Sequence, residues 1–282
     1  MSEPTGRTWV EALPKQLAPQ RRLLEVLLAF CEQDPAVAWL VIGCSLARGN
    51  ADALSDLDLA LGVDDADADD ESIAERVRRA LLLLGEPVDS LTHSLPGGPQ
   101  RIFVQYVDRS QIDLVLGSAT AAFPADTVVL YDPHAAVTIT GPAPGVAPST
   151  LREWAFLACA ALADVGKYLR RRSAWEAHAR LGTARDELWK LFAVALGARD
   201  PQFGLTSIVD FAPELLPAAM QATVTEVDLD ALTAAARAAA ALLAQIADQL
   251  PPTLAAGFPA EMLAYVTAEL GALTPTPGPG TT

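Results

Sequence analysis

Basic residues and cysteines are scarce in this chain of 282 residues. Twenty Lys and Arg stand against 35 Asp and Glu, which gives a formal net charge of −15 at pH 7. Proteins that bind nucleic acid by neutralising phosphates need the opposite sign, so we expect no nucleic-acid partner. The three cysteines, Cys31, Cys44 and Cys159, show no paired spacing. This excludes a disulfide framework or a zinc site as the basis of the fold, and we interpret all three as reduced thiols.

Export and membrane signals are also missing from the pattern. The opening MSEPTGRTWV lacks a basic segment followed by an apolar one, and no stretch approaches eighteen uninterrupted apolar residues. We therefore expect no signal peptide, no membrane span and a cytoplasmic location. Apolar residues make up 51% of the chain and charged residues 20%, which excludes a wholly disordered protein. The length predicts two domains of ordinary size.

The first 140 residues alternate between helical and strand patterns, which predicts a domain with a mixed sheet flanked by helices. Helices are expected at 19–31 and 73–84, and strands at 37–42, 55–61, 101–107, 111–116 and 127–131. The two runs 101–107 and 111–116 are separated by three polar residues, which is typical of a hairpin.

The composition changes after residue 140. The segment GPAPGVAPST, 141–150, predicts a linker, and 151–271 is rich in alanine and leucine with helical periodicity. We therefore predict an α+β protein in which the N-terminal domain is followed by an α-helical bundle. Residues 272–282 have too little apolar content to pack and predict a disordered tail. The alanine-rich stretch 229–250 could pack within the bundle or against a second copy, so a homodimer stays open.

The residues that carry chemistry lie in VIGCSLARGNADALSDLDLAL, 41–61. A strand leads to Gly43, and a turn through Cys44 and Ser45 opens a short helix, where backbone N–H groups favour an anion such as phosphate. Strand alternation places Asp56 and Asp58 on one face. Two neighbouring carboxylates need a compensating cation, and hard oxygen ligands suit Mg²⁺.

A third acid stands out in the next predicted strand but one. Asp113 is a lone carboxylate in an otherwise apolar run, QIDLV, and a buried acid there needs a partner. We predict that Asp113 completes the acidic site.

At these positions the sequence resembles the DNA polymerase beta-like nucleotidyltransferase superfamily. The signature of that superfamily is a Gly-Ser turn, a variable spacer, Asp-x-Asp and a later strand aspartate. SLARG and SDLDLAL are similar to the versions in minimal and antibiotic nucleotidyltransferases, and the resemblance spans about 35–135. The position before Ser45, commonly glycine in the family, is Cys44, although Gly43 precedes it.

The resemblance implies transfer of a nucleoside monophosphate from a magnesium-bound nucleoside triphosphate, such as ATP, to a hydroxyl, with release of pyrophosphate. Asp56 and Asp58 would hold the nucleotide-bound Mg²⁺ and, together with Asp113, a second Mg²⁺ ion.

The same resemblance implies a phosphate site at the turn. Gly43, Ser45 and nearby amides would hold the terminal phosphates of the nucleotide. Arg48 would either reach a phosphate or brace the acidic site through an ion pair.

Substrate choice should lie in the helical domain, because the C-terminal helices of antibiotic nucleotidyltransferases supply acidic groups that bind the acceptor. Glu176, Arg180 and Glu187 could share one helix face and are candidate substrate contacts. The alternative is an ordinary amphipathic helix with a buried apolar stripe formed by Trp175, Leu181, Leu188 and Trp189.

Several functions are compatible with these residues. The leading hypothesis is nucleotidylation of a small hydroxylated, cationic molecule such as an aminoglycoside or lincosamide antibiotic, which would confer resistance. The alternatives are AMP transfer to a protein or addition to RNA, as in toxin and antitoxin nucleotidyltransferases, and a non-catalytic nucleotide-binding protein.

Overall fold

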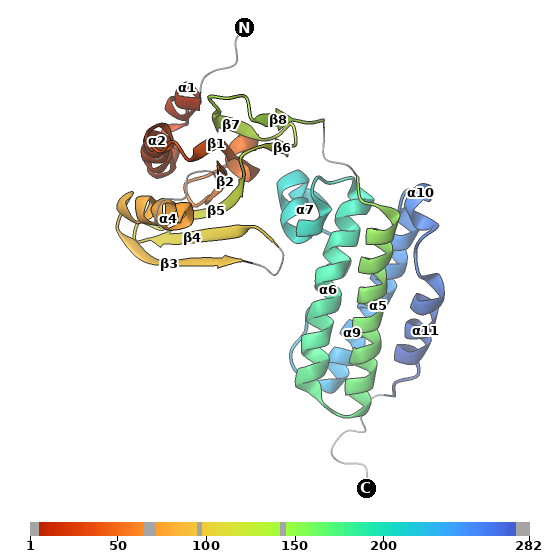
Figure 1. The fold of residues 1–282 in the computed structure, drawn as a ribbon. Coiled ribbons are helices and arrows are strands. Elements are labelled where there is room, and N and C mark those ends of the chain that lie inside the picture. The colour runs from red at the N-terminus through yellow and green to blue at the C-terminus, as the bar shows by residue number, and fades with distance from the viewer. Residues whose placement is uncertain (1–5, 65–71, 95–97, 142–144, 275–282) are drawn as a thin grey trace. The chain divides into compact units, whose positions relative to one another are not determined.

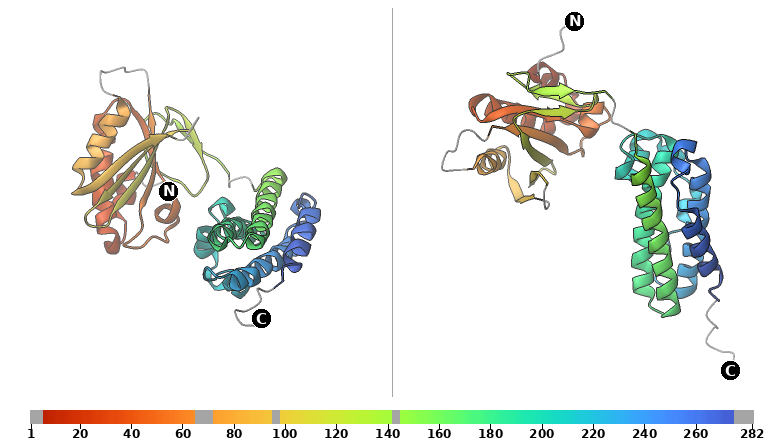
Figure 2. Two further views of the ribbon diagram at one scale, coloured as in Figure 1. Left: turned by 90° about the horizontal axis from the view of Figure 1, so that it is seen from below. Right: turned by 45° about the vertical axis from the view of Figure 1, so that its right-hand side comes forward.

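The computed structural model describes residues 6–64, 72–94, 98–141 and 145–274. The chain divides into two compact units, Met1–Ala143 and Pro144–Thr282, drawn in Figure 1 and from two further directions in Figure 2. The first unit is built on a mixed sheet with helices and the second is helical, so the predicted α+β class is confirmed.

The first unit contains a six-stranded sheet with the strand order β3-β4-β5-β2-β1-β7. The pair β2–β5 in the middle is parallel, and the other four pairs are antiparallel. The strands are β1 (Val37–Ile42), β2 (Leu57–Val63), β3 (Pro87–Ser94), β4 (Gln100–Tyr106), β5 (Gln111–Ser118) and β7 (Val128–Tyr131). Two short parallel strands, β6 (Ala121–Phe123) and β8 (Val137–Ile139), form a second sheet.

Helices cover one face of the large sheet (Figure 2). α2 (Ala18–Gln33) and α4 (Ile73–Leu83) place their leucines and Val77 in one core with alternate residues of the central strands. α1 (Gly6–Glu11) packs on α2 and β7, and η1 (Lys15–Leu17) leads into α2. Because strand residues alternate, Leu57 and Leu59 face this core and Asp58 faces the opposite side of the sheet.

Trp39 covers part of that opposite side. Its side chain is fully buried, and its ring lies where a Cβ atom at Gly62 would be, 2.1 Å from that position. The indole N–H donates to the carbonyl oxygens of Ser118 at 3.2 Å and Ala119 at 3.1 Å, and the ring meets Phe123 edge to face. Trp39 thus fills the end of this face and joins the two sheets.

In its described residues, the second unit is a bundle whose longest helices are α5 (Pro148–Arg170), α6 (Ala174–Leu196), α9 (Leu229–Gln249) and α11 (Ala260–Gly271). Short helices connect them: η2 (Pro201–Phe203), α7 (Leu205–Phe211), η3 (Pro213–Leu215), α8 (Ala218–Gln221) and α10 (Pro252–Ala255).

The ends of this unit differ in detail from the sequence pattern. α5 begins at Pro148, inside the predicted linker, because proline is well suited to the first position of a helix. Residues 142–144 of that linker and 275–282 of the predicted tail lie outside the described residues.

In the part of the chain that the structure describes, α9 is the one helix long and apolar enough to cross a membrane. Its buried residues, which include Leu232, Leu243 and Ile246, belong to the core that α9 shares with α5 and α6. The apolar character of α9 is therefore used in packing the bundle.

The start of α9 gives a first prediction. The Asp228 carboxylate accepts hydrogen bonds from the backbone N–H groups of Asp230 and Ala231, both at 2.9 Å. Asp228→Ala should lower the free energy of unfolding by about 1 kcal/mol, whereas Asp228→Asn should retain most of the cap. Urea denaturation followed by circular dichroism compares the two variants, and equal stabilities would contradict the capping role.

Candidate active site

The parallel pairing of β2 with β5 brings two of the predicted aspartates together. Asp58 is the register partner of Asp113, so the two residues lie side by side on neighbouring strands. Both are half-buried on the face opposite α2 and α4, because the residues that flank them are core leucines and isoleucines. The apolar alternation that packs the sheet also aims both carboxylates to one side.

Asp56 lies in the loop just before β2, whereas the sequence pattern predicted it within a strand. Its carboxylate accepts a hydrogen bond from the Gln111 side-chain amide at 3.2 Å. Asp56 is also close enough to Asp58 for its charge to raise the pKa of the Asp58 carboxyl.

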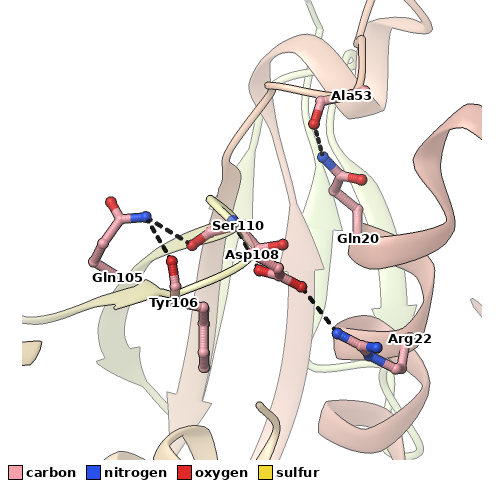
Figure 3. A network of polar contacts seen from close by, with 7 residues as sticks. All are labelled: Gln20, Arg22, Ala53, Gln105, Tyr106, Asp108 and Ser110. Atoms are coloured by element: carbon pink, nitrogen blue, oxygen red, sulfur yellow. Dashed lines mark hydrogen bonds and ion pairs between the residues drawn. The ribbon is translucent and has the colours of Figure 1, made fainter. Parts of the chain in front are cut away.

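Gln20, a residue that the sequence did not single out, holds this loop from α2. The side chain is buried, and its amide nitrogen donates to the carbonyl oxygens of Ala53 at 3.3 Å and Ser55 at 2.9 Å. Figure 3 shows the contact between Gln20 and Ala53 beside the separate Arg22–Asp108 ion pair. Gln20 therefore fixes the segment from which Asp56 emerges.

The predicted turn joins β1 to α3 (Cys44–Arg48) through Gly43. The Gly43 N–H donates to the backbone oxygen of Asp58 at 3.0 Å, which ties the turn to β2 at the aspartate. Gly43 has an extended backbone with φ −119°, and a Cβ atom there would meet no atom of the described residues within 4 Å. Neither packing nor backbone conformation requires glycine, so the space beside this backbone is open to a ligand.

Cys44 stands where the family that the sequence resembles commonly has glycine, and its φ is +52°. This left-handed conformation costs a non-glycine residue about 1–2 kcal/mol. The thiol donates a hydrogen bond to Asp58, and burial, followed by the Asp58 charge, raises the pKa of Cys44 to about 12. At neutral pH Cys44 is therefore a protonated donor to the Asp58 carboxylate.

The electrostatics of Asp58 show an excess of negative charge. Burial raises the pKa of the Asp58 carboxyl, and the charges of Asp56 and Asp113 raise it further. The Cys44 thiol and the Arg101 guanidinium act in the opposite direction but do not cancel these effects. A bound cation would relieve this repulsion.

Two arginines near the turn have different partners. Arg48 Nε donates to Asp126 Oδ2 at 2.9 Å, so its ion pair is with a carboxylate outside the three predicted ones. Arg101 on β4 binds both oxygens of Asp113, through Nε at 3.2 Å and through Nη2. Arg101 was not among the residues predicted from the sequence, although a lone arginine at the start of an apolar alternating run was a signal.

A cavity of about 160 Å³ lies over this face of the sheet. It is lined by Val41, Gly43, Asp58, Leu59, Ala60, Arg101, Asp113, Val115, Phe123 and Thr127. This volume suits a phosphate group and its immediate surroundings better than a whole nucleotide.

Two of the three predicted metal ligands, Asp56 and Asp58, are suited to bind a metal ion. Within the described residues, no three His, Cys, Asp or Glu side chains are grouped so as to hold a metal ion. The Arg101 guanidinium donates to both oxygens of Asp113, so Asp113 differs from the other two predicted metal ligands, Asp56 and Asp58. Asp56 and Asp58 retain the carboxylate chemistry and the excess charge that suit Mg²⁺.

The candidates in the second unit occupy different environments on α6. Glu176 is exposed and accepts a hydrogen bond from Ser173, and Arg180 Nε lies 3.7 Å from Asp164 Oδ2 of α5. Glu187 is buried, with one carboxylate oxygen 2.9 Å from Lys190 Nζ.

The alternative of an apolar stripe on α6 is correct for Leu181 and Leu188, which are buried. It is wrong for Trp175, which is 76% exposed, because the buried face of α6 runs through its neighbours Ala174 and Ala177 and Trp175 lies off that face.

No protein-family model matches this chain, and none of the curated proteins matches it. Among solved structures, an aminoglycoside 6-adenyltransferase from Bacillus subtilis is similar, with 13% identity and a TM-score of 0.39 over 90% of this chain and 97% of that chain. A structure of the GLD-2/RNP-8 complex shows 14% identity and a TM-score of 0.27 over 82% of this chain and 68% of that chain. These similarities are too weak to indicate the chemistry of this chain.

Proposed function

We propose that this protein is a magnesium-dependent nucleotidyltransferase that moves a nucleoside monophosphate, AMP from ATP, to a hydroxyl of a small molecule and releases pyrophosphate. The observation that carries the proposal is the register of Asp58 and Asp113 at the point where the Gly43 turn is hydrogen-bonded to β2. This arrangement joins an acidic pair to an open turn on one cavity.

In this proposal some residues of the first unit bind the metal ion and others bind the phosphates. Asp56 and Asp58 would hold Mg²⁺, which when bound offsets negative charge on the phosphates and favours ionisation of the attacking hydroxyl. The open backbone at Gly43 lets phosphate oxygens approach, and the Ser45 hydroxyl would donate to them. The predicted second ion would need the oxygens of Asp113 that Arg101 binds.

The acceptor that fits best is a small hydroxylated cation, such as an aminoglycoside-type antibiotic. The net charge of −15 favours a cationic partner over nucleic acid. Glu187 is the strongest of the candidate substrate contacts, because its second carboxylate oxygen has no hydrogen-bond partner among the described residues. This oxygen is buried, so a ligand donor would reach it only after the side chain moved. The same proposal includes Glu176 and Arg180 as further contacts with the acceptor. It also includes a cytoplasmic location and a homodimer.

The experiment is to incubate the purified protein with Mg²⁺ and each α-labelled nucleoside triphosphate, and to follow the label by mass spectrometry. The acceptors are a panel of aminoglycosides and lincosamides and, separately, a cell extract. We expect AMP on a small molecule. Label on protein or RNA alone would favour the macromolecular alternatives, and nucleotide binding without any transfer would favour a non-catalytic binding protein.

A further inference from the structure

The ion pair between Arg101 and Asp113 is placed within the candidate site. Arg101 stands opposite Val115 in the β4–β5 ladder, and Asp113 stands opposite Phe103, so the pair is diagonal on one face of the sheet. Both side chains line the 160 Å³ cavity together with Asp58. Arg101 is 38% exposed and Asp113 is 23% exposed, so the pair is open to a ligand in the cavity.

The geometry of the pair decides what else Asp113 can bind. Arg101 contacts Asp113 Oδ1 through Nε and Asp113 Oδ2 through Nη2, which is the two-pronged pairing that a guanidinium makes with a carboxylate. A Mg²⁺ ion would need a carboxylate oxygen at about 2.0–2.1 Å. The guanidinium occupies one acceptor site on each oxygen, so a metal ion at Asp113 would have to share the carboxylate with Arg101 or displace it.

The charges of the site are consistent with a single metal ion beside Arg101. Asp56, Asp58 and Asp113 carry three negative charges when ionised, and Arg101 supplies one positive charge next to them. The remainder is two negative charges, which a single divalent cation balances. One divalent cation is therefore enough to neutralise the charges that the protein itself supplies, and the triphosphate brings further negative charge of its own.

We propose that Arg101 takes the place of a second metal ion at Asp113, so that one divalent cation binds with the nucleotide, at Asp56 and Asp58. This inference rests on the proposed function. The pair uses two of the five N–H donors of the guanidinium. Because Arg101 lines the cavity, its other donors are available to phosphate oxygens, and a fixed cation there stabilises the charge that develops during transfer.

The test counts Mn²⁺ ions bound per chain in the presence of a non-hydrolysable ATP analogue, α,β-methylene-ATP, by electron paramagnetic resonance of free Mn²⁺. The full-length wild type should bind one ion. Arg101→Gln should bind two, because Asp113 is then free to act as a ligand, and Arg101→Lys should bind one because the positive charge remains. The double variant R101Q/D113N should return to one.

Asp113→Asn alone provides a check that does not depend on the folding of R101Q. If Arg101 holds Asp113, D113N should leave the count at one, whereas a two-ion site should fall from two to one. Circular dichroism of each variant verifies the fold.

The outcomes separate this inference from the proposed function. Two ions in the wild type, or one ion in folded R101Q, would overturn the role of Arg101 and leave nucleotidyl transfer standing. A wild type that binds neither the analogue nor Mn²⁺ would overturn the proposed function, and with it this inference.

Discussion

Asp58→Asn should abolish nucleotidyl transfer and, at the same time, make the protein more stable at pH 7. Loss of a metal-binding carboxylate removes several kcal/mol of transition-state stabilisation, which corresponds to a decrease in rate of about 10³-fold or more. The fold should remain intact, because asparagine has the same shape and the Gly43 N–H bonds the backbone oxygen of residue 58. The labelled-nucleotide assay measures the loss of transfer.

The gain in stability follows from the raised pKa of the Asp58 carboxyl. Burial and the charges of Asp56 and Asp113 disfavour the ionised form in the folded state, so the folded protein binds this proton more tightly than the unfolded chain. Ionised Asp58 therefore opposes folding above its folded-state pKa, and this cost disappears as the pH falls through that pKa. Melting curves should show D58N above the wild type at pH 7, with the difference shrinking as the pH decreases.

Asp108→Asn is the matched control for this variant. The Asp108 carboxylate lies in the β4–β5 hairpin, where Ser110 and Arg22 hold its pKa below the usual value although burial acts in the other direction. D108N should therefore lose stability at pH 7 and retain transfer. Wild-type turnover in D58N would show that Asp58 holds no essential metal, and a lower melting temperature in D58N would contradict the charge repulsion.

Trp39→Ala should lower the free energy of unfolding by about 3–5 kcal/mol, which is the usual cost of removing a large buried aromatic side chain. The indole is 1% exposed, its N–H bonds two carbonyl oxygens, and its ring packs on Phe123 of β6. Phe123 lines the cavity, so binding of the ATP analogue should weaken as well. Urea denaturation and calorimetric titration measure the two effects.

The close approach of Trp39 to Gly62 allows a double-mutant test of the same packing. Gly62→Ala alone should destabilise the protein by about 1–3 kcal/mol, because the new methyl group overlaps the indole ring. In the Trp39→Ala background the same change should cost much less. Additive effects would show that the ring does not occupy that space.

Trp175→Ala is the control for the aromatic substitution itself. Trp175 is 76% exposed on α6, so its removal should change the free energy of unfolding by no more than about 0.5 kcal/mol. A large loss there would mean that Trp175 is covered in solution.

The elements that the sequence predicted best are those with one dominant local signal. The apolar run 37–42 coincides with β1, and the helix expected at 19–31 is α2, which begins one residue earlier and ends two residues later. β3 was not predicted, because it is an edge strand with mostly exposed side chains and therefore lacks the alternation of a half-buried strand. β3 is a strand because it pairs with β4, and the sequence of β3 alone does not indicate this pairing.

Some residues of the candidate site were likewise predicted from the sequence, and others were not. Spacing and strand alternation pointed to Asp58 and Asp113, and the register of β2 with β5 places them together. Arg101, the partner of Asp113, lies across the predicted hairpin and was overlooked, whereas Asp126, the partner of Arg48, lies far away in the sequence and has no local signal. The Arg101–Asp113 pair depends on the register of β4 with β5, which one local sequence window does not specify.

The parallel pairing of β2 with β5 also has a consequence for how the chain folds. Asp58 and Asp113 are about 55 residues apart in sequence, and α4 and the β3–β4 hairpin lie between them. Closing such a loop costs conformational entropy before any contact between the strands compensates it, so this pairing is slow compared with local helices and hairpins. The mutual repulsion of the two carboxylates arises only when the central strands meet. The acidic site is therefore assembled by one of the most non-local steps in the folding of this unit.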